Sequence, residues 1–460
     1  MKTYHTPISD LLRAQSAQAR IRFCMPGHKG TRGIYDVTEA GEMDNLLHPT
    51  GVLTQAQTLA AKAYGANACA FSVNGSTGGV LALWTAFVRQ GDVVLTAADS
   101  HFSAASGAVF SDAMPMILPQ RMHGLLPLPA QVADVEAALT VHPEIRAVWV
   151  TSPNYYGLCA DIPRIAACCH VHGAVLLVDA AHGAHFGFAP HLPPQPVEAD
   201  AWVVSMHKTL CVCNQGALVC IGHTAPIPAE AVFRALHRVQ TTSPSWPLLA
   251  QMDEARAQLS VHGVEEYRTL YQRIDTFFQA LRGSAVHPAA LPDGILHDPT
   301  RVVLDITRTG RSGFSLAQQL AQQGIWIEMA DTTHLVLICT PQDTEQSFAA
   351  LATALCSFPV QKTVLSSPLP PPASNMQHSP RAAAYGTMAV CPIHKAAGRI
   401  SAQCVCCYPP GTVTLWPGAL ITRTHIDYIE HMAAQGASLT GVYQATGELA
   451  LYVQDEEAIR

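Results

Sequence analysis

One lysine occupies a position where an ordinary surface charge is out of place. Lys208 comes three positions after the end of the apolar run 201–205, within Ser205-Met206-His207-Lys208. Burial penalises an ammonium group and so favours the neutral amine, which can attack an aldehyde and bind it covalently. A single lysine of this kind is more often a solvated side chain, so its interpretation depends on the residues around it.

A carboxylate ends a second apolar run. Asp179 closes the segment 174–179, and a carboxylate at such a place commonly caps the turn or helix that follows. The alternative role is the counter-ion of a protonated pyridine nitrogen, which carboxylates provide for pyridoxal phosphate. The separation between Asp179 and Lys208 suits one helix and one strand, so we expect both groups at neighbouring strand ends.

A glycine-rich segment, 74–79, lies between an apolar run and an expected helix over 80–89, and its composition predicts a turn. It reads Asn74-Gly75-Ser76-Thr77-Gly78-Gly79. Backbone N–H groups at a helix start, together with two hydroxyls, favour an anion. The segment has neither the lysine of a P-loop nor the three-glycine dinucleotide fingerprint. The turn, the acid and the lysine, each at a strand end, together indicate a phosphorylated cofactor.

A histidine follows another expected strand. His101 comes after the apolar run 92–97. It is either a loop histidine with ordinary hydrogen bonds or a flat ring stacked on the cofactor, with its nitrogens near the reacting carbon.

Alternating strands and helices are expected to position these residues. The predicted strands of this region are 68–73, 92–97, 147–151, 174–179, 201–205 and 217–221. Such alternation builds a mostly parallel sheet covered by helices, and ligands of these sheets bind at the carboxyl ends of the strands.

The pattern changes after about residue 285. Predicted strands there are 301–306, 325–329 and 335–339, and predicted helices are 316–323 and 344–357. The stretch 366–372 is rich in proline, which is typical of a stiff linker. The predicted organisation is a large domain over 1–284, a small α/β domain over 285–358, a linker over 359–380 and a C-terminal domain over 381–460.

Composition excludes several classes of protein. Of 460 residues, 49% are hydrophobic and only 13% are charged, which excludes a wholly disordered chain. The net charge of −7 argues against nucleic acid as the main partner. No apolar run approaches the ~20 residues of a membrane span, and the start of the chain does not resemble a signal peptide. We therefore expect a cytoplasmic protein without a membrane partner.

Cysteine and histidine are abundant, but their spacing does not predict a metal site. The fourteen cysteines are expected to be thiols, because nothing indicates export. The groups 211–213 and 404–407 lack the paired spacing of zinc ligands, and the histidine pairs 170/172 and 182/185 are equally unspecific.

Several longer motifs resemble the Orn/Lys/Arg decarboxylase family of fold-type-I pyridoxal-phosphate enzymes, in its short form without an N-terminal receiver-like domain. The matching stretches extend over nearly the whole chain. They are Met25-Pro26-Gly27-His28-Lys29-Gly30, Asp36-Val37-Thr38-Glu39, Phe71-Ser72-Val73-Asn74-Gly75-Ser76-Thr77, Asp179-Ala180-Ala181-His182-Gly183-Ala184-His185, Ser205-Met206-His207-Lys208-Thr209-Leu210, Thr241-Thr242-Ser243-Pro244-Ser245, Ala397-Gly398-Arg399-Ile400-Ser401-Ala402 and Tyr408-Pro409-Pro410-Gly411.

The resemblance implies an aspartate-aminotransferase-like fold, with a mostly parallel seven-stranded sheet and a smaller C-terminal α/β domain. It implies pyridoxal 5'-phosphate bound covalently by Lys208, with Asp179 at the ring nitrogen and His101 stacked on the ring. Lys208 or His101 would return a proton to the substrate carbon after carbon dioxide leaves. The other implied cofactor-site residues are Ser76, Thr77, Gly78, Ala181, His182, Ser205, His207, Thr241 and Ser243. Because Thr241 and Ser243 would reach a partner's site, the resemblance also implies a homodimer with shared active sites.

Four positions depart from the pattern of the family. Phe102 stands where relatives usually have lysine, Ala180 where they have an acid, Val80 where they have asparagine, and Ala419 where they have the glutamate of Pro-Gly-Glu. That glutamate helps to hold a basic substrate side chain, so the expected decarboxylation of lysine, arginine or ornithine loses one supporting residue. Another reaction of the same cofactor, such as transamination or elimination, or an inactive cofactor-binding paralogue, remains an alternative. Arg399 and Arg423 are the candidate carboxylate clamps of a transaminase.

Overall fold

A computed structural model describes residues 4–17, 21–361, 371–408, 411–445 and 447–455. Most of the proline-rich stretch 366–372 and the centre of the motif at 408–411 lie outside the described residues. The chain forms two compact units, residues 1–87 with 177–268, and residues 88–176 with 269–460.

The main sheet confirms the expected architecture. Its seven strands lie in the order β1-β9-β8-β7-β6-β2-β3. They are β1 (Ala68–Ser72), β2 (Val93–Thr96), β3 (Met114–Ile117), β6 (Ile145–Thr151), β7 (Val175–Asp179), β8 (Ala201–Ser205) and β9 (Ala217–Ile221). Strand β9 is antiparallel to its two neighbours, whereas β7 and β8, β2 and β6, and β2 and β3 pair in parallel. The sheet is therefore mostly parallel.

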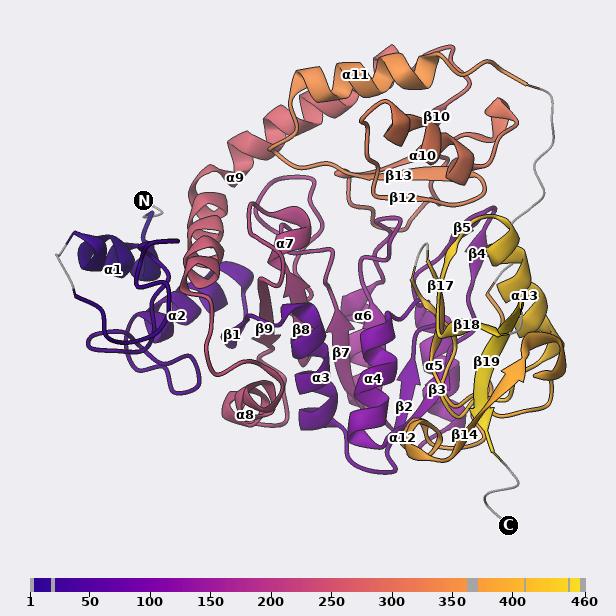
Figure 1. Cartoon of the computed structure of the whole chain (residues 1–460), viewed down its shortest axis with the longest axis horizontal. Helices are drawn as coiled ribbons and strands as arrows, with labels where there is room; N and C mark the ends of the chain where they lie inside the picture. The colour runs from indigo at the N-terminus through magenta and orange to yellow at the C-terminus, as the bar shows by residue number, and fades with distance from the viewer. Residues whose placement is uncertain (1–3, 18–20, 362–370, 409–410, 446, 456–460) are drawn as a thin grey trace. The chain divides into compact units, whose positions relative to one another are not determined.

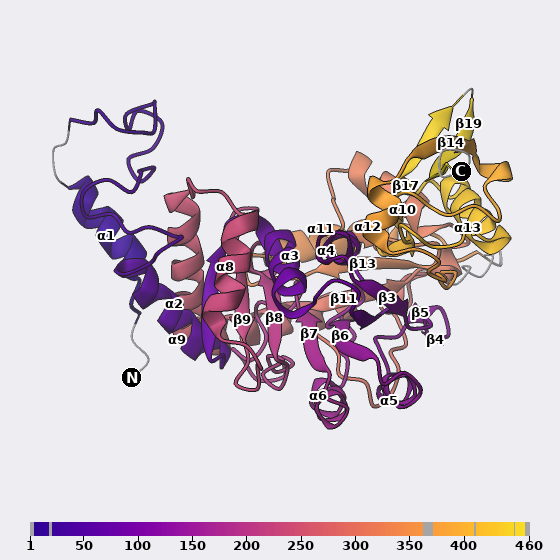
Figure 2. The same cartoon turned by 90° about the horizontal axis from the view of Figure 1, so that it is seen from below.

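The first unit places three strand ends at one edge. Strands β1 and β8 run in the same direction, because each is antiparallel to β9, and β7 is parallel to β8. Their carboxyl ends therefore share an edge of the sheet. The helices of this unit are α1 (Pro7–Ser16), α2 (Val52–Tyr64), α3 (Gly75–Phe87), α7 (Met206–Thr209), α8 (Ala229–Val239) and the first part of α9 (Trp246–Ala280). Figures 1 and 2 show α8 lying beside α3.

The glycine-rich segment is helical, so the predicted turn over 74–79 is wrong. Helix α3 begins at Gly75, five residues before the expected start at Val80. A Cβ atom on Gly79 would lie 2.9 Å from side-chain carbons of both Val203 and Val219. The missing side chain therefore lets the start of α3 pack directly on β8 and β9. Gly79, which resembles a turn residue in the sequence, serves here for close helix packing.

The second unit contains a small antiparallel sheet in the order β10-β11-β13-β12. Its strands are β10 (His287–Pro288), β11 (Arg301–Asp305), β12 (Met329–Ala330) and β13 (His334–Ile338), accompanied by α10 (Gly313–Gln322) and α11 (Glu345–Cys356). The predicted strand 325–329 is wrong except at Met329, the first residue of β12. Trp326 is 84% exposed, so the apolar residues that suggested a buried strand lie outside this sheet.

Further elements complete the second unit. Helices α4 (Phe102–Ser111), α5 (Val132–Val141) and α6 (Ile162–Val171) and the hairpin of β4 (Met122–His123) and β5 (Leu126–Pro127) lie in its earlier segment. The C-terminal segment forms α12 (Pro380–Tyr385), α13 (Arg423–Ala434) and two sheets of three strands, β14-β19-β18 and β16-β15-β17. These strands are β14 (Met388–Pro392), β15 (Val405–Tyr408), β16 (Val413–Leu415), β17 (Ser438–Thr440), β18 (Val442–Ala445) and β19 (Glu448–Gln454).

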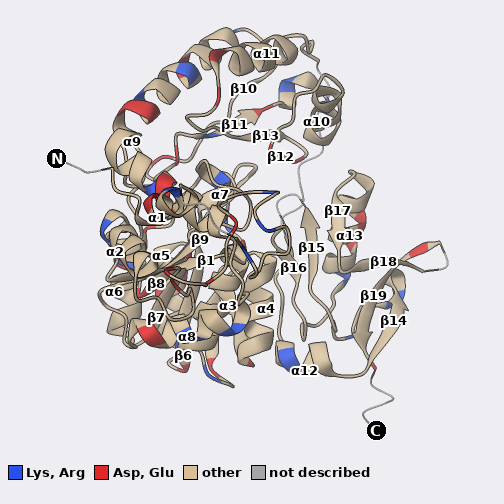
Figure 3. Ribbon diagram, turned by 60° about the vertical axis from the view of Figure 1, so that its left-hand side comes forward, with Lys and Arg blue, Asp and Glu red and all other residues tan. Residues whose placement is uncertain are grey.

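Charged residues are few and dispersed. Figure 3 shows Lys, Arg, Asp and Glu scattered singly over helices and loops, among mostly uncharged ribbon. Among the described helices, none combines the length and the apolar character that crossing a bilayer requires.

A buried histidine, His425, lies in the first turn of α13. The Thr422 side chain accepts from the His425 N–H (3.4 Å), and the Thr422 N–H donates to His425 Nδ1 (3.1 Å), which forms a reciprocal capping box. Burial lowers the pKa of His425 from 6.5 to about 4. Protonation of Nδ1 would abolish its acceptor role, so the folded state binds this proton more weakly than the unfolded chain does.

We expect this histidine to make the protein less stable in acid. Between pH 6.5 and about 4 the unfolded chain binds the proton and the folded state does not, so stability falls as the pH falls through this range. His425→Gln keeps a capping-box acceptor that does not titrate. The free energy of unfolding is measured with denaturant at pH 7 and at pH 4. Its decrease from pH 7 to pH 4 should be smaller by ~3 kcal/mol in the variant than in the parent. An unchanged loss would contradict the assignment.

Candidate active site

The side chain of Lys208 lies at the edge where β1, β8 and β7 end. The short helix α7 begins directly after β8 and carries Lys208, whose Nζ lies 3.1 Å from Nε2 of His182. His182 is buried in the segment that follows β7. The structure therefore brings Lys208 close to the segment that follows Asp179. The contact is made by His182, three positions after Asp179.

Asp179 is buried and holds its own turn. Its Oδ1 accepts from the Ala181 N–H at 3.1 Å. The backbone on either side is bonded to β8, since Ala180 N donates to Val203 O (2.9 Å) and Ser205 N donates to Ala181 O (3.2 Å). The carboxylate thus has the capping role that the sequence suggested, on a segment that is fixed to the strand before Lys208. Capping through one oxygen is compatible with a second partner for the carboxylate.

The start of α3 offers hydrogen-bond donors for an anion. Gly75 N donates to Gln215 O (2.8 Å) and Gly78 N donates to Asn74 O (3.3 Å). Within the described residues, the N–H groups of Ser76 and Thr77 have no protein acceptor, as is usual in a first helical turn. The bond from Gly75 also fixes this turn to the loop that follows Lys208.

Ser205 provides an unsatisfied hydroxyl at the same strand end. Its side chain is fully buried, and among the described residues its Oγ has no hydrogen-bond partner. A buried hydroxyl without a partner is costly, so it indicates a group that the protein alone does not supply.

His207 is an uncharged donor beside Lys208. Its backbone N–H and its Nδ1 both bond to Gly216 O, at 3.2 and 3.0 Å. Burial lowers the pKa of His207 below the usual histidine value; the bond to Gly216 opposes this shift, and the charge of Lys208 adds to it. The ring is therefore neutral at pH 7, and its Nδ1 carries the proton because a carbonyl can only accept.

The first unit contains every predicted site residue except His101. These residues are Ser76, Thr77, Gly78, Asp179, Ala181, His182, Ser205, His207, Lys208, Thr241 and Ser243. Ala181 is buried, whereas Thr241 and Ser243 are exposed and bond to each other through Thr241 Oγ1 and the Ser243 N–H.

His101 belongs to the second unit and is the N-cap of α4. Its Nδ1 lies 2.8 Å from Ser103 Oγ and accepts from the Ser103 N–H at 3.2 Å. A backbone bridge pairs His101 with Thr412. The ring therefore has a capping role in this unit, and stacking on a cofactor remains a prediction.

Three of the four departures from the family pattern are buried side chains. Val80, Ala180 and Ala419 are at most 1% exposed, whereas Phe102 is 40% exposed at the first position of α4. Ala419 donates its N–H to Trp416 O, and its carbonyl accepts from the Ser401 N–H. The motif that begins at Ala397 thus packs against the segment that carries Ala419.

The two arginines considered as carboxylate clamps have partners in their own segment. Arg423 pairs with Asp427 at 2.8 Å, and Arg399 Nη2 donates to Gln454 O at 3.1 Å. No feature of either arginine favours a clamp for a substrate carboxylate.

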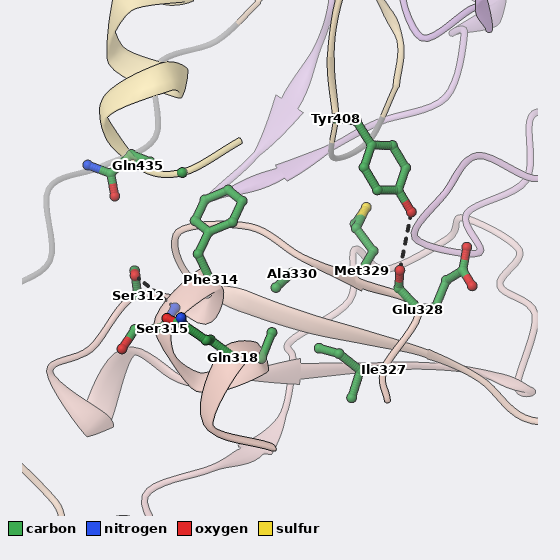
Figure 4. Close-up of a pocket in the computed structure, with 12 residues that line it drawn as sticks. Ser312, Phe314, Ser315, Gln318, Ile327, Glu328, Met329, Ala330, Tyr408 and Gln435 are labelled. Atoms are coloured by element: carbon green, nitrogen blue, oxygen red, sulfur yellow. Dashed lines mark hydrogen bonds between the residues drawn. The ribbon is translucent and has the colours of Figure 1, made fainter. Parts of the chain in front are cut away.

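The second unit also has a pocket that the sequence did not predict. It is about 580 Å³ in volume and is lined by residues of α10, by 327–330, and by Tyr408, Gln435 and Gly436. Tyr155 donates to the Glu328 carboxylate at 2.7 Å, and Tyr408 donates to the Glu328 backbone oxygen (Figure 4). The carboxylate lies on the side of the pocket away from Phe314 (Figure 4).

Glu328 belongs to a structural charge network. Burial lowers the pKa of Arg301, and the charges of Asp298 and Glu328 oppose that shift. Since Glu328 helps to compensate a buried guanidinium, its presence in the pocket needs no ligand. The only sequence signal for it was an acid within the apolar run 325–329.

Comparison with known families settles the family of the chain. A family model for the major domain of Orn/Lys/Arg decarboxylases matches residues 32–292, and the model for the C-terminal domain of the same family matches residues 359–451. The chain belongs to the Orn/Lys/Arg decarboxylase family. The resemblance of the motifs is thereby confirmed, and the chain is a member of a family of amino-acid decarboxylases.

Individual relatives extend over the full chain. It is 28% identical to an arginine decarboxylase of Halalkalibacterium halodurans, over 99% of each chain, and 27% identical to an arginine decarboxylase of Bacillus subtilis, over 100% of each. Among solved structures, a lysine decarboxylase of Francisella novicida superposes with a TM-score of 0.85 at 16% identity, covering 99% of this chain and 82% of that one. The latter similarity concerns the fold.

We expect Ser205→Ala to stabilise the cofactor-free protein but to weaken the binding of the cofactor. Removal of the unsatisfied hydroxyl should raise the free energy of unfolding of the cofactor-free protein by about 1 kcal/mol. The affinity for pyridoxal phosphate should fall at least about tenfold, because a phosphate loses a donor. Denaturant unfolding and fluorescence titration measure the two effects.

Ser72→Ala is the matched control. Ser72 is equally buried at the end of β1, but its Oγ donates to Gly75 O at 2.8 Å, so this variant should be less stable. Stabilisation by Ser205→Ala without loss of affinity would show that the hydroxyl does not face the cofactor.

Proposed function

We propose that this protein is a pyridoxal-phosphate-dependent decarboxylase that converts a basic amino acid into an amine and carbon dioxide. The observation that carries the proposal is the contact of Lys208 Nζ with His182, at the strand edge that also holds Asp179 and the start of α3. The arginine decarboxylases that align over the whole chain support the choice of a basic substrate.

The residues at this edge fit the chemical groups of the cofactor. The N–H groups of Ser76 and Thr77 and the buried Ser205 hydroxyl would hold the phosphate, and His207, whose N–H groups both bond to Gly216 O, would stay neutral. The Asp179 carboxylate would pair with the ring nitrogen, Ala181 would pack on the ring, and Lys208 would bind the aldehyde. When bound, pyridoxal phosphate supplies a protonated ring that takes up the electron pair left behind by departing carbon dioxide.

Lys208 and His182 would carry out the proton transfers of the reaction. Their nitrogens are close enough to share a proton, so His182 can accept one from the Lys208 ammonium and leave a neutral amine. The neutral state of His207 avoids a further positive charge beside them. After the carboxylate has left, Lys208 would return a proton to the substrate carbon, a step in which general acids contribute ~10²–10⁴-fold.

The position of Ala419 bears on the choice of substrate. The side chain there is a buried methyl group and carries no charge for a substrate cation. The basic side chain must therefore find its partners elsewhere, and the preference among lysine, arginine and ornithine is part of the test below. The homodimer with shared sites and the cytoplasmic location expected from the sequence remain predictions.

The test is a search for the amine product. The cofactor-loaded protein is incubated with each common amino acid, and amines and carbon dioxide are measured by mass spectrometry. We expect one dominant amine from a basic amino acid. An oxo acid in place of carbon dioxide would indicate a transaminase, and absence of turnover with bound cofactor would indicate an inactive paralogue; both contradict the proposal.

Lys208→Ala should abolish both the visible absorbance of the bound cofactor and the activity. We expect the rate to fall more than about a thousandfold, as for other residues that form covalent intermediates. Lys62→Ala, in α2 of the same unit, is the control and should keep both properties. Unchanged absorbance in Lys208→Ala would refute the assignment of the lysine.

A further inference from the structure

Two buried thiols in the first unit lie against each other. The sulfur atoms of Cys69 and Cys220 are 3.2 Å apart, and both residues are at most 4% exposed. They occupy opposite positions on the adjacent strands β1 and β9. Neither residue is part of the candidate active site.

The hydrogen-bond pattern of the sheet shows which kind of pair they form. Gly222 N donates to Asp200 O, so the backbone groups of Gly222, and of Cys220 two positions earlier, point toward β8. The backbone of Ile221 points toward β1, where its oxygen accepts from Asn67 N. Cys69 and Cys220 are therefore a non-hydrogen-bonded pair of β1 and β9.

This geometry is within reach of a disulfide. Non-hydrogen-bonded antiparallel pairs have Cα atoms about 4.5 Å apart and bring their side chains closest together. Disulfides span Cα separations of about 4.4–6.8 Å, and those near the limit are strained and more easily reduced. A disulfide between Cys69 and Cys220 would need only a small approach of the two sulfur atoms.

A pocket lies beside one of the two cysteines. Cys69 lines a pocket of about 750 Å³ formed by residues of α2, β1, α8 and the segment 46–50. Arg234, His48 and His237 lie in the same lining and offer polar contacts to an entering molecule. Cys220 is fully buried and is not in this lining, so we expect an oxidant to reach Cys69 first.

We infer that Cys69 and Cys220 form a reversible redox pair that a low-molecular-weight disulfide, such as oxidised glutathione, converts to a cross-strand disulfide. The Cys69 thiolate attacks the small disulfide, forms a mixed disulfide and releases one thiol. Burial raises the pKa of Cys220, so this thiol gives up its proton as its sulfur attacks the Cys69 sulfur and releases the second thiol. The two cysteines lose two protons and two electrons in total, and the small disulfide gains them.

The bond would connect two parts of the active-site framework. Strand β1 leads through Ser72 to the start of α3, and β9 follows the loop whose Gln215 O accepts from Gly75 N. The cross-link would close a loop between positions 151 residues apart. Loops of this length stabilise a fold most in the chain-entropy account. We therefore expect the oxidised protein to melt at a higher temperature than the reduced protein.

The chain contains its own comparison pair. The sulfur atoms of Cys404 and Cys406 are 3.7 Å apart, and both residues are buried. They are separated by one residue on the same segment of chain, where a disulfide demands distortion of the backbone. Contact between buried thiols is thus common to both pairs, while only the first has the cross-strand geometry.

The experiment exposes the folded full-length protein to a series of glutathione redox buffers. The reaction is stopped with acid and alkylation, and peptides are mapped by mass spectrometry. We expect linked peptides of Cys69 and Cys220, lighter by two hydrogen atoms, that disappear after treatment with dithiothreitol. The pair Cys404 and Cys406 should remain alkylated. In Cys220→Ala, Cys69 should instead accumulate as a glutathione mixed disulfide.

Each outcome decides the question. The inference is overturned if Cys69 and Cys220 stay reduced while the exposed cysteines oxidise, or if they form the link only in denaturant. It is also overturned if the parent protein stops at a mixed disulfide on Cys69, because Cys220 then cannot reach it. A melting temperature that does not rise on oxidation would contradict the prediction that a disulfide between β1 and β9 stabilises the fold.

Discussion

The site depends on the alignment of three strand ends in one sheet. Strand β9 runs against β1 and β8, and this reversal makes β1, β8 and β7 end at the same edge. The start of α3 follows the first of these strands, Lys208 the second and Asp179 ends the third. Gly79 completes the arrangement, because only a residue without a side chain lets α3 approach β8 and β9 so closely.

The first unit keeps the polar groups of this edge, while three of the four departures from the family pattern are buried apolar side chains, at Val80, Ala180 and Ala419. The Ser205 hydroxyl has no partner in the described part of the chain, and His207 is held neutral by burial beside Lys208. Ala180 and Ala419, in contrast, are fully buried among backbone hydrogen bonds. Position 419, where the family pattern has a glutamate, therefore carries a buried methyl group without charge.

The sequence predicted the elements that are buried on both faces and missed what depends on packing. Strands β8 and β9 agree with the predicted strands 201–205 and 217–221. Short apolar runs bounded by turn residues are typical of buried strands, so the sequence predicted them correctly. The glycines before Val80 suggested a turn, since their packing partners Val203 and Val219 are distant in sequence. The contact between Lys208 and His182 and the register of Cys69 and Cys220 likewise follow from sheet pairing, which periodicity does not specify.

The central claim is that one amine, that of Lys208, binds the cofactor. The most direct measurement is reduction of the cofactor-loaded protein with sodium borohydride, followed by peptide mapping by mass spectrometry. The chain has six lysines, and none lies between Lys62 and Lys208, so the peptides are readily distinguished. We predict a single pyridoxyl group, on Lys208. A label on another lysine, or no label on a protein that holds the cofactor, would contradict the account.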